Sequence, residues 1–276
     1  MFLKRFWLIS LASALLFFSG GVLLLLASHP TPHKTVLSGN TTNALTVTYV
    51  IDGDTAILSD KRHVRFLGIN SSEKGESYHD EAMNLLKKLV EGKPVSLEYE
   101  NEKTDRYGRT LAYVFLGDMF VNEEMVKDGM AITDFMQKNM KYEAVLTSAE
   151  DDARTQCQGM WEGLCKPEGK CLSFPSINTS GQTRNDEWIQ IQNICPNTIS
   201  LKGYLLKDNS SSNRFTFPDV SLVSGSTITI HSGCGTNTTK DVYWACPQAA
   251  YPVWNNDHDS AFLYNTNGLL VGYYTY

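Results

Sequence analysis

The hydrophobic pattern of this chain changes character at residues 166–182, a Pro-, Gly-, Ser- and Thr-rich stretch that we interpret as a linker between two domains. Before it, residues 44–165 combine β-branched runs with stretches of helical period, which predicts an α+β domain. After it, residues 183–276 keep only short β-like runs separated by turn residues, which predicts an all-β sandwich. The length of 276 residues suits two domains of this size.

The first domain is expected to contain five strands, arranged as a small barrel, and three helices. Runs of apolar and β-branched residues predict strands at 46–51, 55–59, 63–69, 94–99 and 110–116. Apolar residues at helical spacing, followed each time by Gly, predict helices at 78–91, 122–128 and 142–158.

An uncharged stretch at residues 6–27 follows Lys4 and Arg5 near the start of the chain. With a rise of about 1.5 Å per residue, a helix of this length spans the roughly 30 Å hydrocarbon layer of a membrane. We therefore predict a transmembrane helix within residues 1–27, with its N-terminus inside the cell. A tether at 28–43 would then connect this single-pass cell-membrane anchor to domains outside the cell. The alternative is a cleaved signal peptide, which would release a secreted protein.

Six cysteines lie at the end of the first domain and beyond it, and an even number after an export segment predicts disulfide bonds. They are Cys157, Cys165, Cys171, Cys195, Cys234 and Cys246. Closeness in sequence favours the pairs 157–165, 171–195 and 234–246 over the other possible pairings. Free buried thiols or a metal site are the alternatives, and the lack of a Cys-x₂-Cys pair argues against zinc.

The chain is acidic, with a formal charge of −6, and the first domain alone carries −8, from 14 Lys/Arg against 22 Asp/Glu. This balance excludes a histone-like basic protein. It also argues against tight, salt-dependent binding to nucleic acid, because such binding needs many Lys or Arg contacts to phosphates. Any chemistry on a nucleic acid would therefore rely on a few well-placed groups.

Three segments of the first domain carry groups suited to phosphate chemistry: Asp52–Thr55, Arg65–Glu73 and Asp105–Arg109. They supply carboxylate, amide and hydroxyl oxygens, which suit Ca²⁺ or Mg²⁺, and arginines that can bind a phosphate through two hydrogen bonds. Hydrolysis of a phosphodiester needs a cation, guanidinium donors and a base that orients water. Each segment alone is weak evidence, but together they predict a phosphodiesterase.

In these segments and in their order, residues 44–165 resemble the thermonuclease (staphylococcal nuclease-like) family. The matching motifs are Ile51–Thr55, Val64–Glu73, Thr104–Arg109, Leu111–Val114 and Val121–Ala131. The resemblance implies an OB-type five-stranded β-barrel with three helices. It also implies a calcium-dependent extracellular nuclease, an endonuclease that hydrolyses the phosphodiester bonds of DNA and RNA to 3′-phosphate ends.

The resemblance further implies one Ca²⁺ ion, held by Asp54, by the side chain of Asn70 and by the backbone carbonyl of Ser71. Asn70 stands where the best-known members of the family have Asp. An amide oxygen can coordinate calcium but brings no charge, so we expect a weaker calcium site here.

By the same resemblance, Arg65 and Arg109 are expected to bind the phosphate, and Glu73 to act as general base through a water molecule. Tyr107 and Phe135 are expected to stack on or border a nucleotide; for Phe135 the alternative is ordinary core packing. The alternative to a nuclease is a surface-attached binding or adhesion protein whose nuclease barrel has lost catalysis. An intracellular RNA-binding scaffold is a third interpretation, which the export segment opposes.

Residues 183–276 resemble the lamin-tail domain family. The matching segments are Glu187–Ile191, Ile199–Asp208, Trp254–Asp257 and Ala261–Asn265. The resemblance implies an Ig-like β-sandwich that serves as a binding module for an unknown surface partner. The run Asp257–Asp259 could be a metal site, but a structural turn is the preferred interpretation.

Overall fold

The computed structural model describes residues 45–135, 140–180, 187–210, 213–244, 253–256 and 258–276. The predicted anchor and tether, residues 1–43, lie outside these ranges. Within them, no helix is long and apolar enough to cross a membrane. Residues Asn40–Tyr276 form one compact unit.

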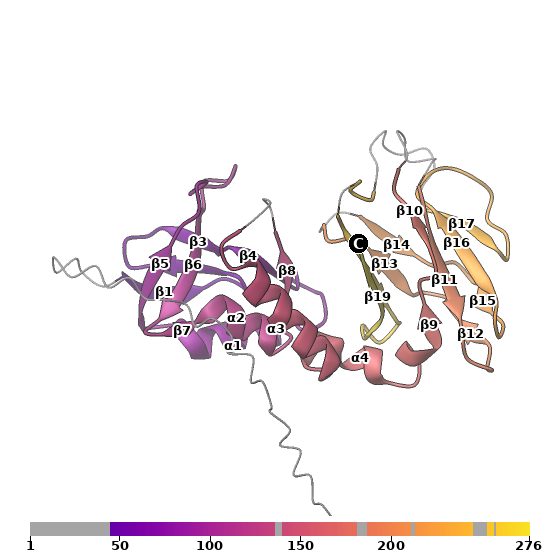
Figure 1. The fold of residues 1–276 in the computed structure, drawn as a ribbon, viewed down its shortest axis with the longest axis horizontal. Coiled ribbons are helices and arrows are strands. Elements are labelled where there is room, and N and C mark those ends of the chain that lie inside the picture. The colour runs from indigo at the N-terminus through magenta and orange to yellow at the C-terminus, as the bar shows by residue number, and fades with distance from the viewer. Residues whose placement is uncertain (1–44, 136–139, 181–186, 211–212, 245–252, 257) are drawn as a thin grey trace, which may run out of the picture. The chain divides into compact units, whose positions relative to one another are not determined.

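The first domain is a closed five-stranded barrel (Figure 1). Its strands are β1 (Leu45–Val50), β2 (Thr55–Leu58), β3 (His63–Phe66), β5 (Pro94–Glu98) and β6 (Thr110–Leu116). They are hydrogen-bonded in the order β3-β2-β1-β5-β6, and a parallel pairing of β3 with β6 closes the barrel. A short sixth strand, β7 (Met119–Phe120), extends the sheet beyond β6. The predicted OB-type barrel is confirmed.

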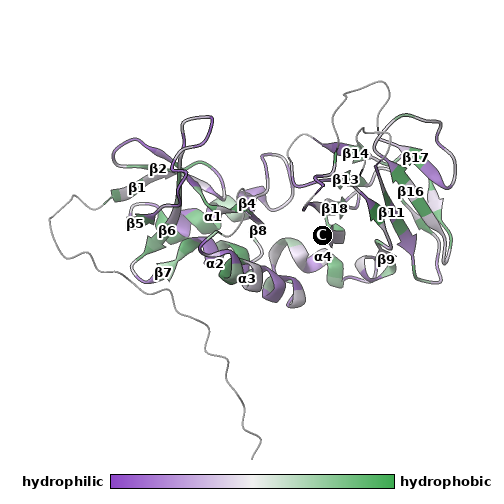
Figure 2. Cartoon of the chain, turned by 45° about the horizontal axis from the view of Figure 1, so that its top comes forward, coloured by the Kyte–Doolittle hydropathy of each residue, from purple (hydrophilic) through white to green (hydrophobic). Residues whose placement is uncertain are grey.

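Three helices pack on the barrel, as predicted: α1 (His79–Val90), α2 (Val121–Lys127) and α3 (Glu143–Thr155). Helix α1 buries one stripe of residues four apart, Ala82, Leu86 and Val90, which is the apolar face that the sequence predicted. These side chains join the barrel strands in one hydrophobic core. In Figure 2, hydrophobic residues run along β6, one of the strands of this core.

The predicted strand at 63–69 is wrong in one respect, because the chain breaks it after Phe66. Gly68 adopts φ +75°, and a Cβ at this position would lie 2.7 Å from Cδ1 of Leu146. The chain turns at this left-handed residue and starts β4 (Gly68–Ser71), which pairs with β8 (Ala131–Asp134) as a separate two-stranded sheet. Strand β8, a run of only four residues, was not predicted from the sequence.

The second domain consists of two main β-sheets, as predicted for a sandwich. One holds β10 (Ile177–Asn178), β11 (Trp188–Asn193), β16 (Thr227–His231) and β17 (Asp241–Tyr243), and β9 (Leu172–Ser173) also pairs with β11. The other holds β14 (Arg214–Thr216), β13 (Leu205–Lys207), β18 (Ser260–Tyr264) and β19 (Leu270–Thr275). A separate pair is formed by β12 (Ile199–Ser200) and β15 (Ser221–Leu222).

Alternate residues of the sandwich strands point into its core. On β11, Ile189 and Ile191 are fully buried, and on β16 Ile228 and Ile230 are fully buried as well. They belong to one hydrophobic cluster with residues of the second sheet. This period-two alternation is typical of strands that bury one face, and it agrees with the sandwich that the short β-like runs and turn residues predicted.

Part of the segment predicted as a linker is structured. The short helix α4 (Glu162–Cys165) and a 3₁₀ turn at Gly169–Cys171 lead into β9, and both β9 and β10 pair with β11. The segment therefore contributes two strands to the sandwich. The Pro, Gly and Ser residues of this segment favoured a linker, and its two strands have only two residues each, too few to show a strand pattern.

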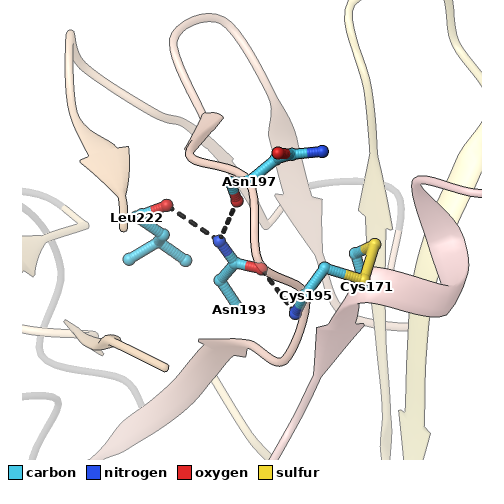
Figure 3. The surroundings of a disulfide bond; sticks show 5 residues. All are labelled: Cys171, Asn193, Cys195, Asn197 and Leu222. Carbon is cyan, nitrogen blue, oxygen red and sulfur yellow. Dashed lines mark hydrogen bonds between the residues drawn. A yellow bond between two sulfur atoms is a disulfide. The ribbon is translucent and has the colours of Figure 1, made fainter. Parts of the chain in front are cut away.

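The disulfides Cys157–Cys165 and Cys171–Cys195 are present, which confirms two of the three predicted pairs. Cys234 is also disulfide-bonded, whereas Cys246 lies outside the described residues. Around the second bond, the buried amide of Asn193 arranges the chain (Figure 3). Its Nδ2 donates to the carbonyl oxygens of Asn197 and of Leu222, the last residue of β15, and its Oδ1 accepts from the Cys195 amide at 3.0 Å.

Candidate active site

The turn between β1 and β2 carries Asp54 and packs closely on the rest of the barrel. A Cβ on Gly53 would lie 2.7 Å from the Cβ atoms of both Ala82 and Ser71, so this position has no room for a side chain. The Asp54 amide donates a hydrogen bond of 3.0 Å to Oδ1 of Asp52. The close packing places Asp54 beside β4, where Ser71 lies.

Strand register places Arg65 next to Asp54. Arg65 on β3 pairs with Thr55, the first residue of β2, and its Nε lies 3.2 Å from Oδ1 of Asp54. Both side chains are largely buried, at 11% and 7% exposed. The Asp54 carboxylate also accepts hydrogen bonds from the Thr55 hydroxyl at 2.9 Å and from the Ser71 amide at 2.7 Å. Donors on both oxygens fix the orientation of this carboxylate.

The guanidinium of Arg65 also reaches β4. Its Nη2 donates to Oδ1 of Asn70 at 3.0 Å, and its Nη1 donates to the backbone oxygens of Phe66 and Ile69. Arg65 therefore connects the two side-chain oxygens, on Asp54 and Asn70, that were predicted to hold calcium. A bound cation would compete with Arg65 for these oxygens.

Arg109 is oriented by Asp105 in the loop before β6. Oδ2 of Asp105 accepts from Nε of Arg109 at 2.7 Å, and Oδ1 accepts from the backbone amides of Tyr107 and Arg109, both at 2.9 Å. Burial raises the pKa of Asp105, but the hydrogen bonds and charge of Arg109 outweigh it and hold this pKa below its usual value. An ionised Asp105 thus fixes the turn and the arginine together.

Tyr107 is the most exposed aromatic side chain near this loop, at 68% exposed. The guanidinium carbons of Arg106 and Arg109 lie 4.8 and 5.6 Å from the centre of its ring. Contacts of this kind between a cation and an aromatic face are attractive. They leave the tyrosine available to stack on a base.

One pocket brings most of the predicted site residues together. Its lining includes seven of the eight: Asp54, Arg65, Asn70, Ser71, Glu73, Tyr107 and Arg109. The eighth, Phe135, does not line it and instead packs against the barrel core. The two arginines thus line the same pocket as the acidic and amide side chains, which is the combination that phosphate chemistry requires.

The same pocket is also lined by Asp52 and Asp105, which lie in two of the predicted segments, and by Asp134 and Asn209, which were not predicted from the sequence. Burial and the nearby Asp54 raise the pKa of Asp52 to about 6. Burial also raises the pKa of Asp134, which Arg65 lowers and Asp54 raises. Asp52 and Asp105 belong to motifs that the sequence shows, whereas nothing in the sequence places Asp134 or Asn209 near the site.

The donor set fits a weakly bound hard cation. Among the described residues, no group of three or more His, Cys, Asp or Glu side chains is arranged to hold a metal ion. Asp54, Asn70 and Ser71 line one pocket, and carboxylate, amide and carbonyl oxygens are the type of ligand that Ca²⁺ accepts. With a single carboxylate among them, the set leaves other coordination positions to water or substrate.

The preferred interpretation of the run 257–259 as a turn agrees with the contacts of Asp259. Its carboxylate accepts hydrogen bonds from the backbone amides of Ser260 and Asn255, at 2.7 and 3.0 Å. Asp257 lies outside the described residues.

Comparison with known proteins assigns both domains. Residues 63–163 match the staphylococcal nuclease homologue family, and residues 170–276 match the lamin tail domain family. A thermonuclease of Staphylococcus intermedius is 38% identical over 123 residues, which cover 41% of this chain and 73% of that protein. A thermonuclease of Staphylococcus hyicus is 34% identical over 137 residues, 45% of this chain and 81% of that protein.

A third relative, an uncharacterized endonuclease of Escherichia coli O157:H7, is 35% identical over 119 residues, 42% of this chain and 74% of that protein. In all three relatives the similarity extends over most of their own length. The family model matches the domain that supplies most of the pocket residues. The chain is therefore a member of the staphylococcal nuclease family, with a nuclease domain that is followed by a lamin tail domain.

Proposed function

We propose that this protein is a calcium-dependent endonuclease that hydrolyses the phosphodiester bonds of DNA and RNA and leaves 3′-phosphate ends. The observation that carries the proposal is the single pocket lined by Asp54, Arg65, Glu73 and Arg109. It combines a fixed carboxylate, two guanidinium groups and an exposed acid, which are the groups that phosphodiester hydrolysis needs. The names of the thermonuclease relatives support the same activity.

In this proposal Arg65 and Arg109 bind the non-bridging oxygens of the phosphate and neutralise the charge that develops on them. Glu73, which is exposed at the pocket, accepts a proton from the attacking water. Calcium, when bound, supplies positive charge beside the phosphate. Asp54, Asn70 and the Ser71 carbonyl would hold it there.

The acidic barrel is compatible with this function. Catalysis needs only a few cations at the scissile phosphate, whereas tight binding along a duplex needs many. A charge of −8 on residues 44–165 thus predicts an enzyme that binds its substrate loosely and locally. Tyr107 would add stacking on a base, which does not depend on sequence.

The direct test is cleavage by the full chain, under oxidising conditions, of plasmid DNA and of a defined RNA, with Ca²⁺ or with a chelator. We expect Arg109→Ala to lower kcat by about 10²–10³-fold, because it removes a donor to the developing charge. Arg62→Ala is the matched control, since Arg62 also makes a 2.7 Å ion pair with a nearby aspartate but lies outside the pocket. Identical rates for the two variants would contradict the role of Arg109, and no cleavage by the natural protein in Ca²⁺ would favour a binding protein with a lapsed barrel.

We also propose that the protein is exported and held at the cell membrane by residues 1–27, with the domains outside; release by signal cleavage is the alternative. The apolar stretch at 6–27 after two basic residues supports export. The disulfides suit an oxidising compartment. Cell fractionation, followed by N-terminal sequencing of the mature protein, separates an anchored form from a cleaved one.

A further inference from the structure

Residues of the lamin tail domain reach the nuclease pocket. Asn209 and Ser210, which follow β13, line the same pocket as the predicted catalytic groups. Nδ2 of Asn209 donates a hydrogen bond of 3.2 Å to Oδ1 of Asp134, at the end of β8. Residues Asn40–Tyr276 form one compact unit, so these contacts lie within it.

A second and stronger connection runs through Glu76, in the loop between β4 and α1. Its Oε1 accepts from Nζ of Lys207 on β13 at 2.9 Å, and Nη2 of Arg214 on β14 contacts the same oxygen. Its Oε2 accepts from the backbone amide of Glu73 at 2.9 Å. One carboxylate therefore connects the backbone of the proposed general base to two cations of the other domain.

The environment of Glu76 makes this connection more than a surface ion pair. The side chains of Lys207 and Glu76 are only 12% and 16% exposed, so water screens their attraction little. Burial raises the pKa of Glu76, but the charge and hydrogen bond of Lys207, the Glu73 amide and Arg214 together hold it below its usual value. Exposed pairs, by contrast, contribute almost nothing.

Apolar packing supports the same arrangement. Ile132 on β8 and Trp161, near the end of the nuclease domain, form a buried cluster with Phe262 and Leu270 of the lamin tail domain. Trp161 and Phe262 are almost completely buried. Hydrophobic burial of this kind gives the contact a stability that ion pairs alone would not supply.

We propose that the lamin tail domain is a structural part of the nuclease site, and that Glu76 is the positioning residue through which Lys207 and Arg214 hold the loop that carries Glu73. The proposal rests on the nuclease function proposed above. Glu73 itself is exposed, and its loop is also anchored by the contact of 2.9 Å between Nδ1 of His79 and the carbonyl of Ser72. A general base must lie within hydrogen-bond reach of its water, so a small displacement of this loop reduces turnover.

The test uses Lys207→Met in the full chain, with Lys207→Arg as the conservative variant. Lys202→Met is the matched control, because Lys202 also makes a 2.9 Å ion pair within the lamin tail domain, with Asp219, but both partners are exposed. We expect Lys207→Met to lower kcat about tenfold with little change in KM, and Lys207→Arg to restore it. Lys202→Met should behave as the natural protein.

A second measurement does not depend on activity. Hydrogen exchange of the peptide that spans residues 72–77 should be faster in Lys207→Met and unchanged in Lys202→Met, because only the first change weakens the acceptor of the Glu73 amide. Unchanged exchange in Lys207→Met would overturn the connection, whatever the activity. Faster exchange in a protein that cleaves no nucleic acid would overturn the nuclease function and keep the connection between the domains.

Discussion

At the residue scale, two features define the site. One proposed calcium ligand, Asn70, is uncharged, and the charged side chains around it are held by hydrogen bonds. Asn70 contributes an oxygen without charge, and that oxygen already accepts a hydrogen bond from Arg65. Asp54 is the only carboxylate in the proposed ligand set. In the proposed site, Arg65 and calcium would share the same two side chains, so binding of calcium would require Arg65 to give up part of its contacts.

The first prediction follows from this competition. Asn70→Asp should lower the Ca²⁺ concentration for half-saturation by roughly tenfold, because it restores a charged ligand. Calorimetric calcium titration measures the change without reference to activity. Asn197→Asp adds the same charge at an exposed position of the lamin tail domain and should change nothing. Equal calcium affinity in Asn70→Asp and the natural protein would contradict the assignment of Asn70 as a ligand.

The second prediction concerns Asp105. Replacement by Ala removes all three hydrogen bonds that orient Arg109 and its turn, so kcat/KM should fall roughly 10- to 100-fold. Asp60→Ala is the control, since Asp60 accepts from the amide and Nε of Arg62 in the same way, outside the pocket. Steady-state kinetics on a short oligonucleotide give both values. A loss of similar size in Asp60→Ala would mean that the effect is not specific to Arg109.

At the element scale, the strands and helices of the barrel were predictable because each carries a long apolar pattern. Strands β8, β9 and β10 were not predicted: β9 and β10 have only two residues each and β8 has four, which is too short to show a period by itself. Most of the site was predictable because its residues sit in consecutive motifs on the β1–β2 turn, on β3 and β4, and before β6. The contributions of Asp134 and Asn209 depend on tertiary packing, which no local pattern records.

The third prediction belongs to the β1–β2 turn. Gly53→Ala should destabilise the fold by about 1–3 kcal/mol, because its methyl group would meet Ala82 and Ser71 at 2.7 Å. It should also weaken calcium binding, since the turn carries Asp54. Gly117→Ala provides the comparison: a Cβ there would have no atom within 4 Å, and only the φ of +62° opposes the change. Urea unfolding and calcium titration of both variants separate crowding at the site from ordinary backbone strain.

At the scale of the whole molecule, the charge distribution and the placement of the domains set how substrate is held. The nuclease domain carries −8, and the cations that face the pocket are few. We therefore expect nucleic acid to meet its main cluster of positive charge at the pocket, where Arg65, Arg106 and Arg109 lie. An enzyme of this kind should accept flexible strands more readily than a rigid duplex that must lie along an acidic surface.

The fourth prediction concerns the number of phosphate contacts that the protein makes with duplex DNA. If Arg65 and Arg109 make the main phosphate contacts, the logarithm of the affinity for duplex DNA should fall with the logarithm of salt concentration with a slope of about −2. Binding of Glu73→Gln to labelled duplex in Ca²⁺, between low and physiological salt, measures the slope. A much steeper slope would show that many scattered lysines also contact phosphates.

The pairing of β9 and β10 with β11 determines where a fragment of the lamin tail domain can begin. These two short strands, from the segment between the domains, together cover one edge of β11, and β16 covers the other. A fragment that starts at residue 183 would leave that edge open as a template for aggregation. It would also leave Cys195 as a reactive thiol, because its partner Cys171 would be lost. A fragment of the lamin tail domain should therefore begin before Cys171, within the segment that the sequence predicted as a linker.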